Sequence, residues 1–151
     1  MDKQFLIRAI EKAKESVEAG GFPAGAIIVQ DNKIISEGIS IGKLMNDPTA
    51  HAETVAIRDA CKNLGTRDLK GATLYASLEP CIMCLGVAMW SSISRIVYAC
   101  SSKNVSNEYY GGSYNADEMN SKFNHPIEII QISELEDDSL EVVKNWEKSL
   151  S

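Results

Sequence analysis

The chain has few cysteines and prolines, four of each among 151 residues, and it has no long apolar run. Its longest apolar stretches, such as residues 24–29, are far shorter than the roughly 20 residues of a bilayer-spanning helix. Met1-Asp2-Lys3-Gln4 leads into a charged segment rather than an apolar block, so no secretory signal peptide is expected. These absences predict a cytoplasmic globular protein whose cysteines are thiols or metal ligands rather than disulfides.

An excess of basic charge is also missing. Residues 1–99 hold 11 Lys/Arg and 11 Asp/Glu, whereas residues 100–151 hold 4 Lys/Arg and 10 Asp/Glu. The formal net charge of −6 therefore lies entirely in the last third of the chain. Because nucleic-acid binding depends on a basic surface, this distribution favours a small-molecule ligand over a nucleic-acid partner.

The patterning is that of one α/β domain over residues 1–151. Apolar residues at helical spacing alternate with short β-type runs, and Asp31-Asn32 supplies turn chemistry for an opening hairpin. Asp47-Pro48 is typical of a helix start. The order predicts a three-layer α/β/α fold with a mixed sheet. We expect helices over residues 3–19, from 47 to near 65, 80–90 and 138–149, and loops over 39–46 and 101–116. Strands are expected over 26–29, 33–38, 73–77, 95–99 and 127–132.

Two motifs at expected helix starts bring metal ligands together. One contains His51, and the other contains Cys81 and Cys84 at i and i+3, which places both sulfurs on one helix face. A helix N-terminus favours the thiolate form that binds zinc. One histidine and two cysteines leave the fourth tetrahedral position free for water, as in a catalytic zinc site. We therefore predict one Zn²⁺ per chain.

Glu53 is not needed as a fourth ligand, so we interpret it as the proton carrier of the site. A Cys-x-x-Cys pair alone also occurs in redox centres and structural zinc knuckles, and His-x-Glu alone arises by chance. Their order, spacing and joint position at helix starts favour the catalytic interpretation. Cys61 and Cys100 are interpreted as small core residues, and His125, which precedes a proline, as a loop residue.

His-x-Glu followed by Pro-Cys-x-x-Cys resembles the cytidine deaminase-like superfamily of zinc deaminases. The resemblance runs from about Phe5 to the C-terminus and is densest over residues 46–53 and 73–98. It implies a five-stranded mixed sheet between helices, frequent homodimers, and hydrolytic release of ammonia from an amino-substituted nucleobase or nucleoside. Glu53 would move the protons, and the backbone at Glu79 would line the exit for ammonia.

Within the superfamily, the guanine deaminases are most similar, through residues 46–53 and through Cys84-Leu85-Gly86 followed by Trp90. The resemblance implies that Ala52, Trp90, Tyr110 and the residue at position 40 contact the substrate, with Tyr109 and Tyr110 as a lid. Position 40 is Ser40 where most branches carry asparagine, and Gly111-Gly112 occupies a stretch where guanine deaminases carry an acidic residue.

Three alternatives to a guanine deaminase stay open. Bacterial tRNA adenosine deaminases share the zinc core but differ after the last core strand, where this chain has the sequence of residues 107–113. Yeast-type cytosine deaminases resemble the chain in size and in the acidic final helix, but not at Trp90. A zinc-stabilised binding protein without activity is the last alternative, and the retained Glu53 argues against it.

Overall fold

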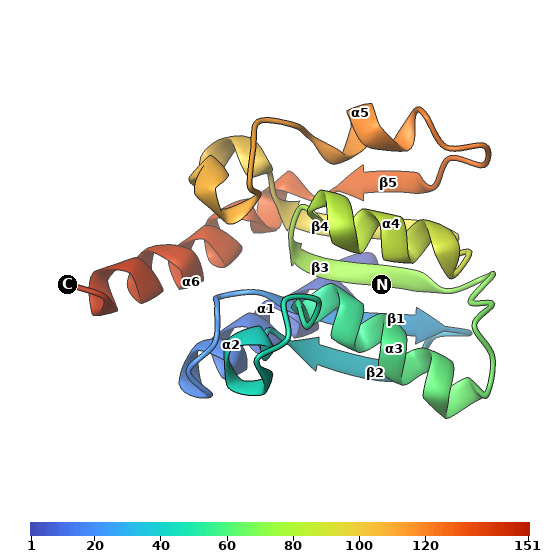
Figure 1. Ribbon diagram of the computed structural model, residues 1–151, viewed down its shortest axis with the longest axis horizontal. Coiled ribbons are helices and arrows are strands. Elements are labelled where there is room, and N and C mark those ends of the chain that lie inside the picture. The colour runs from blue at the N-terminus through green and yellow to red at the C-terminus, as the bar shows by residue number, and fades with distance from the viewer.

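In the computed structural model, which describes residues 1–151, five strands form one mixed sheet in the order β2-β1-β3-β4-β5 (Figure 1). β1 is antiparallel to both β2 and β3, whereas β3, β4 and β5 run parallel. This confirms the predicted five-stranded mixed sheet. The strands are β1 (Gly25–Gln30), β2 (Lys33–Ile39), β3 (Thr73–Leu78), β4 (Arg95–Cys100) and β5 (Glu128–Gln131).

Helices cover both faces of the sheet, with α3 and α4 in front of it in Figure 1 and α1 behind it. The helices are α1 (Asp2–Glu18), α2 (Gly42–Met45), α3 (Ala52–Leu64), α4 (Ile82–Trp90), α5 (Ala116–Asn120) and α6 (Glu136–Ser149). Short 3₁₀ turns occupy Ser102–Asn104, Asn107–Tyr109 and Ser133–Leu135. No helix has both the length and the apolar character that crossing a membrane requires.

Strand alternation builds the two cores. On β1, Ala26 and Ile28 face the core under α3 and α4, and Ile27 and Val29 face the core under α1. All four side chains are at most 6% exposed, as expected for a strand covered on both sides. β1 is therefore packed on both faces of the sheet.

The opening hairpin turns as predicted, at Asp31 and Asn32. Both residues have positive φ, 53° and 61°, which is the conformation of a two-residue hairpin turn whose twist matches the strands. Helix α3 ends at Gly65, also with positive φ, where glycine avoids the Cβ penalty.

The predicted start of α3 at Asp47-Pro48 was wrong. The Asp47 carboxylate accepts hydrogen bonds from the backbone N–H and the hydroxyl of Thr49, at 2.8 and 2.7 Å, and so stabilises a local turn. The helix starts only at Ala52, after an extended His51. The expected loop over 39–46 contains the short helix α2, and α4 begins at Ile82 rather than at Pro80. The other boundaries shift by one or two residues.

Candidate active site

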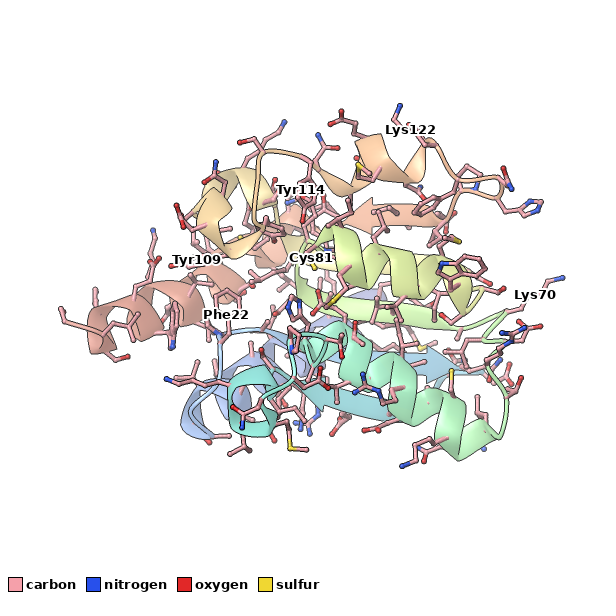
Figure 2. All side chains as sticks on the ribbon, viewed as in Figure 1. Phe22, Lys70, Cys81, Tyr109, Tyr114 and Lys122 are labelled. Atoms are coloured by element: carbon pink, nitrogen blue, oxygen red, sulfur yellow. The ribbon has the colours of Figure 1, made fainter.

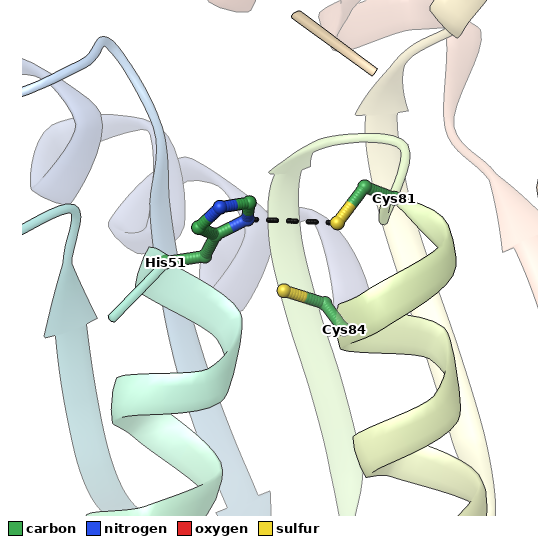
Figure 3. A group of neighbouring side chains, drawn as sticks. All are labelled: His51, Cys81 and Cys84. Carbon is green, nitrogen blue, oxygen red and sulfur yellow. Dashed lines mark hydrogen bonds between the residues drawn. The ribbon is translucent and has the colours of Figure 1, made fainter. Parts of the chain in front are cut away.

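Two helix starts meet at the carboxyl end of β3 and carry the predicted metal ligands (Figure 3). His51 and Cys81 both occupy the position before the first helical residue, with extended backbone. Cys84 lies one turn into α4 and is fully buried. The three candidate ligand atoms lie within 4.8 Å of one another. The carboxyl edge of strands is where open α/β sheets bind their ligands.

The spacing of these atoms fits zinc. The His51 Nδ1 and Cys81 Sγ atoms are 3.5 Å apart. With zinc–sulfur and zinc–nitrogen bonds of about 2.3 and 2.05 Å at the tetrahedral angle, the expected separation is about 3.6 Å. One imidazole and two thiols are also the donor types that zinc prefers. The three side chains could therefore hold a zinc ion, which would supply Lewis acidity beside the neighbouring cavity.

Hydrogen bonds among the three side chains favour the thiolate form of Cys81. Side-chain hydrogen bonding with Cys84, reinforced by His51, lowers the pKa of Cys81 to about 4, and the same interaction raises the pKa of Cys84. Hydrogen bonding to Cys81 raises the pKa of His51. Cys81 is therefore an anionic ligand at neutral pH, and a cation that replaces the shared proton would complete the set.

Glu53 lies on the first turn of α3 and is only 7% exposed. Burial, together with the negative charge of Cys81, raises the pKa of Glu53 to about 7. A carboxyl group with a pKa in this range can both take up and release a proton near neutral pH. These are the properties expected of a proton carrier.

A cavity of about 230 Å³ opens beside the ligands and brings most predicted site residues together. It is smaller than the roughly 300–1,000 Å³ of drug-sized ligand pockets, so it suits a small ligand or one group of a larger ligand. Its lining comprises Phe22, Ala24, Ser40, His51, Ala52, Glu53, Leu78, Glu79, Cys81, Tyr109 and Tyr110.

Trp90 is the predicted substrate residue that the structure does not bring to this cavity. It lies at the opposite end of α4 from Cys81, and it is 79% exposed. Its neighbours line a separate groove between α3 and α4. Among the residues interpreted as structural, Cys100 is buried, Cys61 is partly buried, and His125 lies in an exposed bend.

An aromatic cluster stands at the mouth of the cavity instead (Figure 2 labels Phe22 and Tyr109). The ring centroids of Phe22 and Tyr109 are 5.0 Å apart, and that of Trp146 is 5.2 Å from Phe22 and 6.0 Å from Tyr109. The hydroxyl of Tyr109 donates to Glu147, so α6 holds this lining residue from outside. Sequence reasoning missed Phe22 and Trp146 as site residues. The only signal was a tryptophan among the charged residues near the end of the last helix.

Glu79 anchors the segment that carries Tyr110. The hydroxyl of Tyr110 donates to the backbone carbonyl of Glu79 at 2.7 Å. The buried Glu79 carboxylate accepts hydrogen bonds from the backbone N–H groups of Ser102 and Ala116, at 3.0 and 2.7 Å. One residue next to the metal ligands thus holds both ends of the segment over residues 102–116.

Residues 1–100 match the family model of the cytidine and deoxycytidylate deaminase zinc-binding region. The chain belongs to this deaminase family. The match confirms the resemblance predicted from the two motifs, and the group formed by His51, Cys81 and Cys84 is compatible with the zinc that this family binds.

The relatives of this deaminase include guanine deaminases and tRNA adenosine deaminases. The chain is 52% identical over 96 residues to a guanine deaminase of Bacillus subtilis, covering 63% of this chain and 62% of the relative. It is 41% identical over 104 residues to a tRNA-specific adenosine deaminase of Aquifex aeolicus, covering 68% and 69%. A solved structure from a study of A-to-I editing by tRNA:A34 deaminases superposes with a TM-score of 0.81 at 30% identity, covering 93% of this chain and 99% of that one.

Proposed function

We propose that the protein is a zinc-dependent hydrolytic deaminase of a free nucleobase or nucleoside, with guanine, converted to xanthine, as the first candidate. The observation that carries the proposal is a buried Glu53, with its pKa raised to about 7, in the wall of a small cavity beside three zinc-type ligands. A purely structural zinc site would need neither the open position nor the carboxylate.

The chain's own residues supply the proton transfers. A zinc ion held by His51, Cys81 and Cys84 would contribute Lewis acidity, which makes water nucleophilic near neutral pH. The Glu53 carboxylate accepts one proton from the attacking water and delivers it to the ring nitrogen. It then takes the second proton from the added hydroxyl group and delivers it to the departing amine, as the carbon–nitrogen bond breaks and the carbonyl forms. Burial of Glu53 keeps its two protonation states close in free energy, because one pKa unit corresponds to about 1.4 kcal/mol. The result is a carbonyl product and ammonia.

The preference for a small purine rests on three features. The cavity is small, the last third of the chain carries the net negative charge of −6, and the Bacillus subtilis guanine deaminase is 52% identical over the aligned segment. Ser40 lines the cavity and can both donate and accept a hydrogen bond through its hydroxyl. We infer that Ser40, Ala52 and Tyr110 contact the base, and that the Glu79 carbonyl lies on the path of the departing ammonia.

Ammonia release by the zinc-loaded protein tests this proposal, with guanine, adenine, cytosine, their nucleosides and an anticodon stem-loop as substrates. We expect turnover of guanine. Glu53→Gln should retain zinc and lose at least about 10²-fold in rate, the lower range for a proton-transfer group. Glu18→Gln, on the exposed end of α1, is the matched control and should be fully active. Full activity of Glu53→Gln would remove Glu53 from the mechanism.

A tRNA adenosine deaminase is the second candidate, supported by the Aquifex aeolicus relative and by the tRNA deaminase structure. It requires inosine to form in the stem-loop, with affinity that falls steeply as salt rises. Activity on the stem-loop alone would overturn our interpretation of the acidic C-terminal third. Turnover of cytosine alone would favour the cytosine deaminase alternative, and zinc binding without any turnover would favour a binding protein.

We also infer a homodimer with one zinc ion per chain. Helix α4 contains no charged residue, yet Ile82 and Trp90, on the same face, are 50% and 79% exposed. A second copy packed against this face would bury both side chains. Light scattering should give twice the mass of 16.5 kDa, and Trp90→Glu should shift the protein toward that monomer mass. A monomeric wild-type protein would contradict the inference.

A further inference from the structure

A hydroxyl from α3 reaches one of the zinc-type ligands from the side away from the cavity. Thr54 is 5% exposed, and its Oγ1 lies 3.2 Å from the Sγ of Cys84, which is fully buried. Thr54 lies in the first turn of α3, and its hydroxyl is turned toward Cys84 on α4. Thr54 is absent from the lining of the cavity, whereas His51 belongs to it.

The chemistry of the pair fixes the direction of this hydrogen bond once a metal is bound. A metal-ligating cysteine is a thiolate, which has no proton and can only accept. A threonine hydroxyl carries one O–H donor. The hydroxyl makes no other side-chain hydrogen bond in the structure, so it is free to donate to sulfur.

We propose that Thr54 is a positioning residue of the metal site: its hydroxyl donates to the Cys84 sulfur and holds this thiolate in the orientation that binds zinc. The buried sulfur would otherwise be an anion without a polar partner on this side, which is costly. Such outer partners of metal ligands typically change metal affinity 10- to 100-fold when they are removed. Zinc affinity is measured without a substrate, so this proposal can be tested whichever base the protein acts on.

Two substitutions separate the hydroxyl from the volume of the side chain. Thr54→Val keeps the branched shape and removes the donor, and Thr54→Ser keeps the donor and removes a methyl group. Thr54→Ala provides a second variant without a hydroxyl if valine perturbs folding. Thr73→Val is the matched control, because Thr73 is also buried, at 8% exposed, but lies at the far end of β3.

Competition with a chromophoric chelator measures zinc affinity directly. We expect the zinc dissociation constant to rise about tenfold or more in Thr54→Val and Thr54→Ala. Thr54→Ser and Thr73→Val should bind zinc as the wild type does. Equal affinity of Thr54→Val and the wild type would overturn the proposal, and so would an equal loss in Thr54→Ser, because the hydroxyl would then not be the cause.

Cobalt substitution gives a spectroscopic signature that a merely structural role would not move. Loss of the donor raises the energy of the sulfur lone pairs, so sulfur-to-cobalt charge transfer needs less energy. The charge-transfer band of Thr54→Val should therefore move to longer wavelength, while that of Thr54→Ser should coincide with the wild-type band. Superimposable wild-type and Thr54→Val spectra would contradict the assigned hydrogen bond.

Discussion

Gly38 on β2 is where a single methyl group should disturb the metal site from a distance. An ideal Cβ at this position would lie 2.2 Å from the carbonyl oxygen of Ala52 and 2.8 Å from the backbone nitrogen of Ala56. Ala52 stands between His51 and Glu53 at the start of α3. The close approach of β2 to α3 therefore requires glycine at position 38. This contact positions the start of α3, which carries His51 and Glu53.

The expected magnitude follows from this overlap. Ordinary contacts begin near 3.5 Å, so in Gly38→Ala the start of α3 must retreat by about 1 Å. Overpacking of this kind costs about 1–3 kcal/mol of unfolding free energy. For a domain of this size, 1 kcal/mol corresponds to roughly 2–4 °C in Tm. Metal ligands tolerate about 0.2 Å of displacement, and a misplacement of 1 Å can cost about 10²-fold in rate.

Thermal unfolding, zinc competition and ammonia release test this prediction together. Gly38→Ala should lower all three: Tm, zinc affinity and turnover. The control is Gly112→Ala, whose added methyl group would meet only the Tyr114 ring, at 3.8 Å, and which should unfold at nearly the wild-type temperature. Wild-type zinc affinity in Gly38→Ala would refute the reasoning, because α3 would then not be positioned by its contact with β2.

Two further predictions concern buried and half-buried carboxylates. The hydrogen bond from Arg95 lowers the pKa of Asp2 below its usual value of 3.8, so the ionised carboxylate stabilises the folded protein. This contribution to the free energy of unfolding is present at neutral pH and is lost as the pH falls below 3.8 through the lowered pKa. Urea unfolding should show Asp2→Asn less stable than the wild type by at most about 1 kcal/mol at pH 7, with the difference vanishing in acid. Glu79→Ala leaves the backbone N–H groups of Ser102 and Ala116 without their acceptor, which should cost about 1–3 kcal/mol of unfolding free energy for each group. The substitution should also raise KM, because the segment that carries Tyr110 is held less firmly. Unchanged stability in urea would contradict the role of Glu79 in holding this segment.

The local part of the candidate ligand set could be predicted from the sequence, whereas the approach of His51 to the two cysteines depends on how α3 and α4 pack. His51 and Cys81 each precede a helix, and the helix geometry alone places Cys84 beside Cys81. The apolar β-type run over residues 26–29 likewise predicted a strand, and the structure buries its side chains on both faces of the sheet. These features are set within a few residues, so spacing is a sufficient guide to them.

The aromatic cluster of Phe22, Tyr109 and Trp146 could not be predicted in this way, because it depends on where distant segments pack. Trp90 and Trp146 are similar as sequence signals, each near the end of a helix. Only the path of α6 across the sheet brings Trp146 to Phe22 and leaves Trp90 on the exposed face of α4. The prediction of the start of α3 was wrong for a different reason. The Asp47 carboxylate accepts a hydrogen bond from the Thr49 backbone N–H in a turn instead of capping a helix.

The candidate ligands and some of the residues that close the cavity lie on different parts of the chain. The family match ends at residue 100, and it contains the whole ligand set and Glu53. The cavity is closed by residues beyond this point, Tyr109 and Tyr110, and Tyr109 is held in turn by α6. That same part of the chain carries the excess of acidic residues. Changes in the C-terminal third can therefore alter the part of the cavity lining that Tyr109 and Tyr110 form, while Ser40 and Ala52 supply another part from within the family match.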